Sequence, residues 1–190
     1  MSSKAKNEII NNLIKNDNEN NDLSSFSWKE MIPSIIYGLL IVAQLILVFF
    51  FYNVYRIKLL VWMGWGMFAL FLIIGSLPRI AFKKYGGIRE GEGHLNTTKL
   101  VKSGIYAIIR HPYWFSWILL SLSLSFLSQY WVMVLFGIIS SIIIYLETYH
   151  LDKRLIQKFG KSYNVYKKQV PRMNLIIGLI KYLTNNNNRC

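Results

Sequence analysis

The chain has 190 residues, of which 53% are hydrophobic and only 16% charged, and its formal net charge is +13. Its apolar residues come in long runs rather than in periodic stripes, which excludes an ordinary soluble domain and predicts an integral membrane protein. Its basic residues lie at the ends of these runs, which fits anionic lipid headgroups better than nucleic acid. The single cysteine, Cys190, excludes an intramolecular disulfide, and three scattered histidines argue against a metal site.

The N-terminal half begins with a polar segment and continues with two apolar runs. Residues 1–27 are rich in asparagine, and we expect a disordered tail there. The first apolar run covers 31–55, with Gln44 as the polar residue near its middle; the second covers 59–77. A helix that crosses ~30 Å of hydrocarbon needs about 20 residues. Both runs are therefore predicted to be transmembrane helices.

A long polar segment separates these two helices from the next pair. Residues 79–110 are charged and rich in glycine, and we expect them to form a long loop. A connection of this length in a compact bundle is commonly either functional or a disordered connector. Apolar runs at 112–127 and 131–149 then predict a helical hairpin. Its second helix continues into polar sequence as far as Gly160, a residue suited to a helix C-terminus.

The C-terminal segment is predicted to contain two short helices. Residues 162–169 have an amphipathic pattern that Pro171 ends. Residues 175–183 are apolar but too short to span a bilayer, so we expect them at the membrane interface or against the bundle. A polar tail at 184–190 follows. The predicted fold, over 28–183, is an all-α, polytopic membrane helix bundle with about four transmembrane helices and cytosolic amphipathic C-terminal helices.

The distribution of positive charge predicts the orientation of the bundle. The segment before the first apolar run, the long loop and the C-terminal segment carry 4, 7 and 9 of the Lys and Arg residues, whereas the two short loops carry 2 and none. Cytosolic loops of membrane proteins are enriched in Lys and Arg. Both termini and the long loop are therefore predicted to be cytosolic, which agrees with four crossings.

This orientation gathers ionisable residues from separate segments at one cytosolic mouth of the bundle. Arg110 and His111 stand directly before Pro112, and proline is well tolerated in the first turn of a helix. Two acids lie near the end of the last apolar helix, and an arginine follows Pro171. Ionisable residues at a membrane boundary are functional candidates. The candidates are Arg110, His111, Glu147, Asp152 and Arg172.

At these residues the sequence resembles the isoprenylcysteine carboxyl methyltransferase family and the related phospholipid methyltransferases. Three family motifs occur in order over roughly 98–173. They are Gly-x-Tyr-(x)3-Arg-His-Pro, matched by Gly104, Tyr106, Arg110, His111 and Pro112; Leu followed by Phe-Gly-(x)2-Tyr-(x)2-Tyr, matched by Leu155, Phe159, Gly160, Tyr163 and Tyr166; and Val-Pro-Arg, matched by Val170, Pro171 and Arg172. The chain departs from the family pattern at three places: Trp114 replaces a tyrosine, Ser116 a glycine, and Leu151-Asp152 a Glu-Glu pair.

The resemblance implies a membrane methyltransferase that uses S-adenosylmethionine and acts on a lipidic substrate. The expected acceptor is the carboxylate of an isoprenylcysteine or a similar small prenylated acid. Arg172 would hold this acidic group, and Glu147 is the second catalytic candidate because it can replace the missing acid. The residues implied in binding the cofactor are Tyr106, Arg110, His111, Pro112, Asp152, Tyr163 and Tyr166. The expected partners are the lipidic substrate and membrane lipids.

Three other functions remain open from the sequence. The first is methylation of a phospholipid amine. The second is an NADPH-dependent isoprenoid or sterol reductase, since those enzymes have a similar C-terminal half and Lys153, Arg154 and Lys158 could bind a 2′-phosphate. The third is a membrane scaffold without activity, which the loss of one acid and of the glycine would favour. The short chain and the Val170–Arg172 motif favour methyl transfer over reduction.

Overall fold

The computed structural model describes residues 28–85 and 100–187; the predicted tail at 1–27 lies outside these ranges. The described chain is helical, which confirms the all-α prediction. Its elements are α2 (Trp28–Phe50), α3 (Lys58–Tyr85), the 3-10 turn η2 (Gly104–Ala107), α4 (Pro112–Ser128), α5 (Trp131–Phe159), α6 (Lys161–Gln169) and α7 (Leu175–Asn187).

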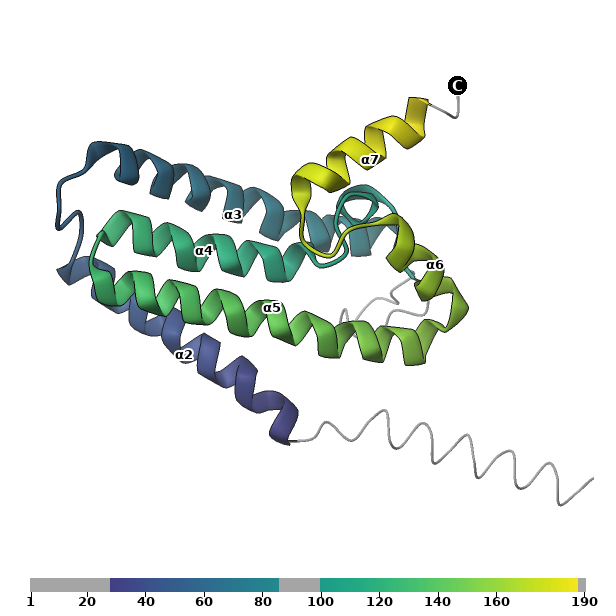
Figure 1. Ribbon diagram of the computed structural model, residues 1–190, viewed down its shortest axis with the longest axis horizontal. Helices are drawn as coiled ribbons and strands as arrows, with labels where there is room; N and C mark the ends of the chain where they lie inside the picture. The colour runs from purple at the N-terminus through teal and green to yellow at the C-terminus, as the bar shows by residue number, and fades with distance from the viewer. Residues whose placement is uncertain (1–27, 86–99, 188–190) are drawn as a thin grey trace, which may run out of the picture.

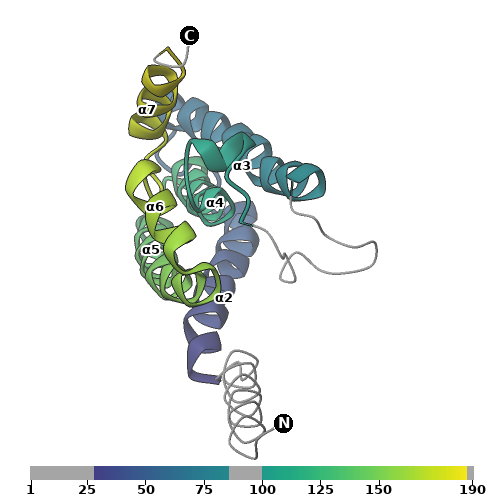
Figure 2. The same cartoon turned by 90° about the vertical axis from the view of Figure 1, so that its right-hand side faces the viewer.

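The helices α2 to α5 form the bundle, and α4 is its central helix. Figure 1 shows α3, α4 and α5 side by side with alternating direction, while α2 crosses beneath them. In the end view of Figure 2, α4 lies among α2, α3 and α5, and it packs against all three. Within the described ranges, three segments are long and apolar enough to cross a membrane: Met31–Phe50 of α2, all of α3 and all of α5. The fourth predicted crossing, α4, has 17 residues and is largely buried between the others.

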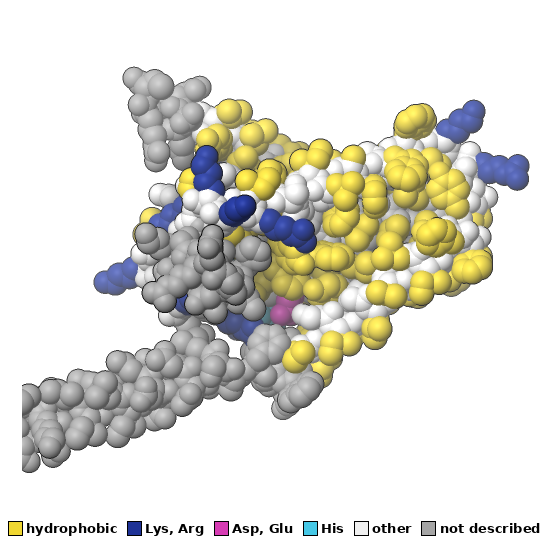
Figure 3. Space-filling model, turned by 180° about the vertical axis from the view of Figure 1, so that it is seen from behind, with side chains coloured by type: hydrophobic (Ala, Val, Ile, Leu, Met, Phe, Trp, Pro, Cys, Tyr) yellow, Lys and Arg dark blue, Asp and Glu magenta, His cyan; other side chains and the backbone are white. Residues whose placement is uncertain are grey.

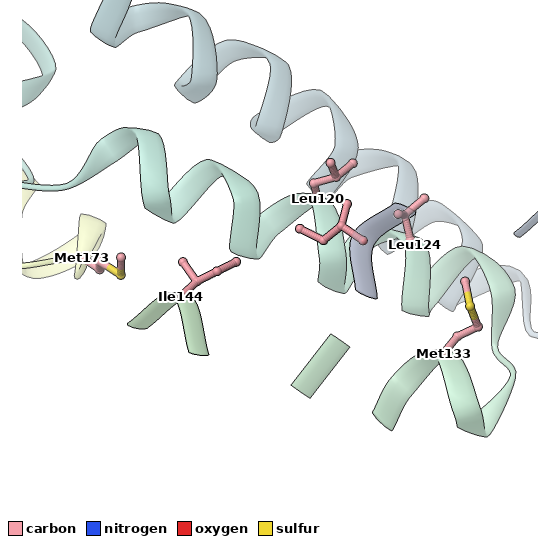
Figure 4. Close-up of a cluster of buried hydrophobic side chains, with 6 residues drawn as sticks. Leu120, Leu124, Met133, Ile144 and Met173 are labelled. Atoms are coloured by element: carbon pink, nitrogen blue, oxygen red, sulfur yellow. The ribbon is translucent and has the colours of Figure 1, made fainter. Parts of the chain in front are cut away.

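Apolar side chains serve two purposes in this arrangement. A buried cluster joins the helices and reaches the C-terminal segment through Met173; Figure 4 shows Leu120 and Leu124 of α4 and Met133 and Ile144 of α5 in this cluster. Many other apolar side chains are exposed on the outside of α2, α3 and α5, and Figure 3 shows them as a broad surface along the bundle. Such a surface suits contact with lipid, as the composition predicts.

In the middle of the bundle, a buried polar side chain of α2 makes hydrogen bonds to α4 and α5. The fully buried Gln44 of α2 donates to the carbonyl of Ser121 at 3.2 Å and to that of Met133 at 3.0 Å. The Ser121 hydroxyl donates back to Gln44 Oε1 at 2.6 Å. In an apolar environment an unpaired amide is costly, so these bonds fix how α2 sits on the hairpin of α4 and α5.

Close packing explains a glycine in the first half of α3. A Cβ added at Gly64 of α3 would lie 2.8 Å from Leu127 Cγ, so α4 packs directly on this backbone. Among the described residues, nothing lies within 4 Å of the same position at Gly66, so this glycine does not mark a close helix contact. A second close contact opposes Gly75 to Ser116, where the added Cβ would lie 3.2 Å from the hydroxyl.

Two predicted helix ends differ from the structure. The first helix ends at Phe50 rather than near residue 55, because the following turn places Asn53 at a φ of 52° and its N–H donates to the Leu127 carbonyl. The second continues through Pro78 to Tyr85, into the segment expected to be a loop. Proline costs the helix a hydrogen bond, but packing of this last part against η2 maintains it.

The C-terminal elements follow the predictions closely. The hairpin's second helix runs without a break to Phe159, and Gly160 ends it with a φ of 55°. The amphipathic helix is α6, and the short apolar segment forms α7, which extends a few residues beyond the predicted end at 183.

Candidate functional site

The site lies at the end of the bundle where η2, the start of α4, the end of α5 and α6 meet (Figures 1 and 2). The segment after α6 runs back across the start of α4. The Arg110 N–H donates to the Pro171 carbonyl at 3.1 Å, and the His111 N–H donates to the Arg172 carbonyl at 3.2 Å. These two bonds bring the first and third motifs into backbone contact, although about 60 residues separate them.

The buried carboxylate of Asp152 is the centre of the site. Arg110 Nη1 donates to both of its oxygens at 3.0 Å each, and Arg172 Nη2 donates to Oδ2 at 2.8 Å. The His111 ring places Nε2 2.9 Å from Oδ1, and the Tyr163 hydroxyl donates to the same oxygen. Four side chains from three separate segments therefore converge on one acid that α5 supplies.

Positive charge exceeds negative charge in this cluster. Two guanidinium groups share the Asp152 carboxylate, and the Nε atoms of both Arg110 and Arg172 are buried without a hydrogen-bond partner within the described ranges. Burial acts to lower the pKa of Arg172, but the Asp152 carboxylate outweighs it and the pKa is raised, so this side chain stays charged. The cluster can therefore attract an anion.

His111 is neutral in this environment, because burial lowers the pKa of its imidazole below the ordinary 6.5 despite the neighbouring carboxylate. A neutral ring that donates from Nε2 to Asp152 keeps Nδ1 as an acceptor. His111 is the N-cap residue of α4, but its side chain makes no capping bond and turns to Asp152 instead. Pro112 is the first residue of α4, as predicted, and is buried.

Arg172 is held on its other side by aromatic rings that the sequence analysis did not identify. The centre of its guanidinium lies 3.5 Å from the centroid of the Tyr149 ring and 5.8 Å from that of Tyr145. These tyrosines are one turn apart on α5 and pack edge to face. Their spacing gave no sign of the contact, because Arg172 reaches them from a segment beyond α6.

The three tyrosines implied in cofactor binding are packed into the base of the site. Tyr163 and Tyr166 are 1% and 3% exposed and lie edge to face on α6. The Tyr166 hydroxyl donates to the Tyr106 carbonyl at 2.6 Å, which ties α6 to η2. Burial raises the pKa of all three phenols, so each remains protonated and able to donate.

Glu147 is the second buried acid of the described chain. It lies on α5 five residues before Asp152 and is 7% exposed. Glu147 and Asp152 are the only acidic residues whose side chains are described, and Figure 3 shows acidic atoms in a recess between apolar side chains. A carboxylate thus borders the apolar surface at this end of the bundle.

The two departures on α4 have structural explanations. Ser116 is 1% exposed, opposes Gly75 of α3 and donates its hydroxyl to the Tyr113 carbonyl at 2.7 Å. A glycine on the neighbouring helix thus makes room for the larger residue. Trp114 packs edge to face on Tyr37 of α2, with ring centroids 5.8 Å apart. Both residues join α4 to a neighbouring helix.

Comparison with known proteins identifies one family. Residues 92–165 match the family model of the isoprenylcysteine carboxyl methyltransferase (ICMT) family. No curated protein and no solved structure gives a significant match to the chain. The matched segment includes η2, α4, α5 and Tyr163, and it ends before the Val170–Arg172 motif. The match confirms the family resemblance that the motifs predicted, and it supports a methyltransferase in a membrane.

Proposed function

Because the match to the ICMT family covers most of the site, we propose that this chain is an integral membrane methyltransferase dependent on S-adenosylmethionine. Its proposed acceptor is a lipidic acid, the carboxylate of an isoprenylcysteine or a similar small prenylated compound. The observation that carries the proposal is the buried cluster on Asp152, in which two arginines share one carboxylate beside an apolar helix bundle.

The residues of the cluster fit the cofactor. S-adenosylmethionine supplies an electrophilic methyl group and carries a carboxylate at its amino-acid end. The unpartnered Nε atom of Arg110 and the surplus positive charge suit that carboxylate. The Asp152 oxygens are already engaged by the chain's own donors, so we assign Asp152 the positioning of Arg110, His111 and Arg172. Tyr106, Pro112, Tyr163 and Tyr166 support this arrangement from η2, α4 and α6.

Arg172 is the proposed ligand of the acceptor's acidic group. Asp152 and the Tyr149 ring fix two sides of its guanidinium, and its Nε atom has no partner within the described ranges. A carboxylate acceptor is already a nucleophile and needs no general base. The work of the protein is then to orient the two reactants and to exclude water from them. The apolar outer surface lets the lipid part of the acceptor reach this end from the bilayer.

Methylation of a phospholipid amine is the second candidate. An amine must lose a proton before it can accept a methyl group, and the buried carboxylate of Glu147 could bind the ammonium and take that proton. Glu147 therefore has a catalytic role only with an amine acceptor, whereas Arg172 is required for a carboxylate.

Binding of S-adenosylhomocysteine and of NADPH to the detergent-purified protein tests the proposal by calorimetry. We expect S-adenosylhomocysteine to bind, and Arg110→Ala and His111→Ala each to weaken binding by about tenfold or more, the loss of one charge-assisted hydrogen bond. Lys167→Ala, an exposed residue of α6, is the matched control. Binding of NADPH alone would assign the chain to the reductases, and binding of neither would favour the scaffold.

A methylation assay with a prenylated cysteine and with a phospholipid amine then identifies the acceptor. We expect Arg172→Ala to abolish methylation of the prenylated acid and Glu147→Gln to leave it largely unchanged. If the single variants Arg110→Ala, His111→Ala and Arg172→Ala all retain activity, the site lies elsewhere.

A further inference from the structure

The helix α7 touches the rest of the molecule through its glycine. A Cβ added at Gly178 would lie 2.0 Å from the carbonyl oxygen of Ile108 and 2.9 Å from its carbonyl carbon. The helix backbone therefore rests directly on the backbone of the loop that leads to Arg110 and His111. Any residue larger than glycine would push the two apart, since a backbone atom cannot turn aside as a flexible side chain can.

The other residues of α7 are largely uncovered. Gly178 is buried and Leu175 half-buried, and Figure 1 shows the helix leaving the bundle near the start of α4. Its apolar side chains are exposed by 43–73%: Ile176, Ile177, Leu179, Ile180, Tyr182 and Leu183. A surface of this kind on a short helix indicates a contact that the described chain does not itself provide.

The level at which α7 is attached coincides with the end of the apolar part of the bundle. Gly104 approaches the Cβ of Ala81 on α3, with an added Cβ 3.7 Å away, and the Tyr106 ring packs on Phe82 at 5.3 Å. The last part of α3 is basic here, with Arg79 just before these residues and Lys83–Lys84 just after them. The change from apolar to basic sequence marks the boundary between hydrocarbon and headgroups.

We propose that α7 is an interfacial helix bound to the lipid surface of the membrane that holds the bundle, and that Gly178 transmits this anchoring to the loop carrying Arg110 and His111. Its 13 residues are too few to cross a bilayer but enough to lie in its interface. The lipid is favoured over a second protein because the uncovered residues begin at the level where the lipid-facing surface of α3 ends. Contact with the membrane then helps to hold the site together.

Spin labels test the lipid contact without any assay of activity. With Cys190→Ser removing the only cysteine, labels are placed through Ile180→Cys on α7 and, as the control, Lys168→Cys on the exposed face of α6. In vesicles containing anionic lipid, we expect the label at 180 to collide readily with oxygen and to lose collisions with a water-soluble nickel chelate. Access to both reagents equal to that at 168 would place α7 in water, and protection from both would indicate a protein partner; either result overturns the proposal.

Hydrogen exchange tests the coupling between α7 and the site loop. We expect Gly178→Ala to speed exchange of the Arg110 and His111 amides about tenfold, which corresponds to about 1.4 kcal/mol of local stability. Gly66→Ala, at a glycine with nothing within 4 Å, is the matched control. If Gly178→Ala does not fold, Ile180→Asp probes the same coupling from the lipid side. Unchanged exchange would show that α7 and the loop are independent. Neither measurement depends on methyl transfer, so either can contradict this proposal without contradicting the proposed function.

Discussion

Among single residues, Asp152 has the greatest electrostatic consequence, because it neutralises charge on two arginines at once. Its side chain is 3% exposed, and those of Arg110 and Arg172 are 6% and 14% exposed. Removing the acid from such a group leaves like charges buried together without a counter-ion. The main effect of Asp152 is therefore to prevent two buried guanidinium groups from lacking a counter-ion, rather than to add attraction of its own.

We predict that Asp152→Ala lowers the free energy of unfolding by about 3–5 kcal/mol, the usual cost of breaking a buried ion pair on one side. The measurement is denaturant unfolding in detergent. The exposed neighbour Lys153 provides the control, and Lys153→Ala should change stability little. A loss below about 1 kcal/mol, typical of exposed ion pairs, would mean that water reaches the cluster.

His111 makes stability depend on pH. Its pKa is below the ordinary 6.5 in the folded protein, so at lower pH the unfolded chain binds a proton that the folded protein does not. We predict that His111 makes stability fall as pH drops below about 6.5. Thermal unfolding from pH 8 to pH 5 checks this, and His111→Gln should flatten the profile in that range.

At the scale of the helices, α4 is the element that the others surround. It is short and carries serines at buried positions, and Gln44 of α2 supplies the side chain that joins it to α5. This explains why an amide stands in the middle of an apolar run: all four of its hydrogen bonds cross to other helices.

We predict that Gln44→Leu lowers the free energy of unfolding by about 1–2 kcal/mol, the range for hydrogen bonds between membrane helices. Unfolding in detergent measures the change. Ile46→Leu, on the exposed side of the same helix, is the control and should have little effect. Equal stability of the two variants would show that apolar packing alone places α2.

At the scale of the whole molecule, the site and most of the described basic residues lie at one end of the bundle, while Arg56 and Lys58 lie at the other. Figure 1 shows α3 and α5 running toward that end and α4 running away from it. The polar part of α5, from Asp152 onward, and all of α6 extend there as well. If the enrichment of Lys and Arg at this end sets the orientation of the bundle, the site faces the cytosol.

We predict that both termini are cytosolic, and thiol labelling in intact cells checks this. The native Cys190 should react with a membrane-impermeant maleimide only after the cells are permeabilised. Lys58→Cys in a Cys190→Ser background, at the opposite end of the bundle, should react in intact cells. The reverse pattern would show that the site faces away from the cytosol.

The sequence by itself determined the helical class, the main apolar helices and the candidate residues. Hydrophobic runs and charged ends follow from the cost of placing polar groups in hydrocarbon, so they can be found without any structure. The Arg110–His111 pair, Asp152 and Arg172 were recognisable in the same way, because charged residues at a membrane boundary stand out against apolar neighbours.

Only the tertiary structure decided which of these residues meet. The sequence could not show that Asp152 faces the chain's own arginines, that Tyr149 stacks on Arg172, or that Gly178 rests on Ile108. It also misplaced the end of α3, because the charges that begin at Arg79 predict a loop, whereas this part of α3 stays helical and packs against η2. These contacts join segments far apart along the chain, and their energies depend on distances that local sequence patterns do not contain.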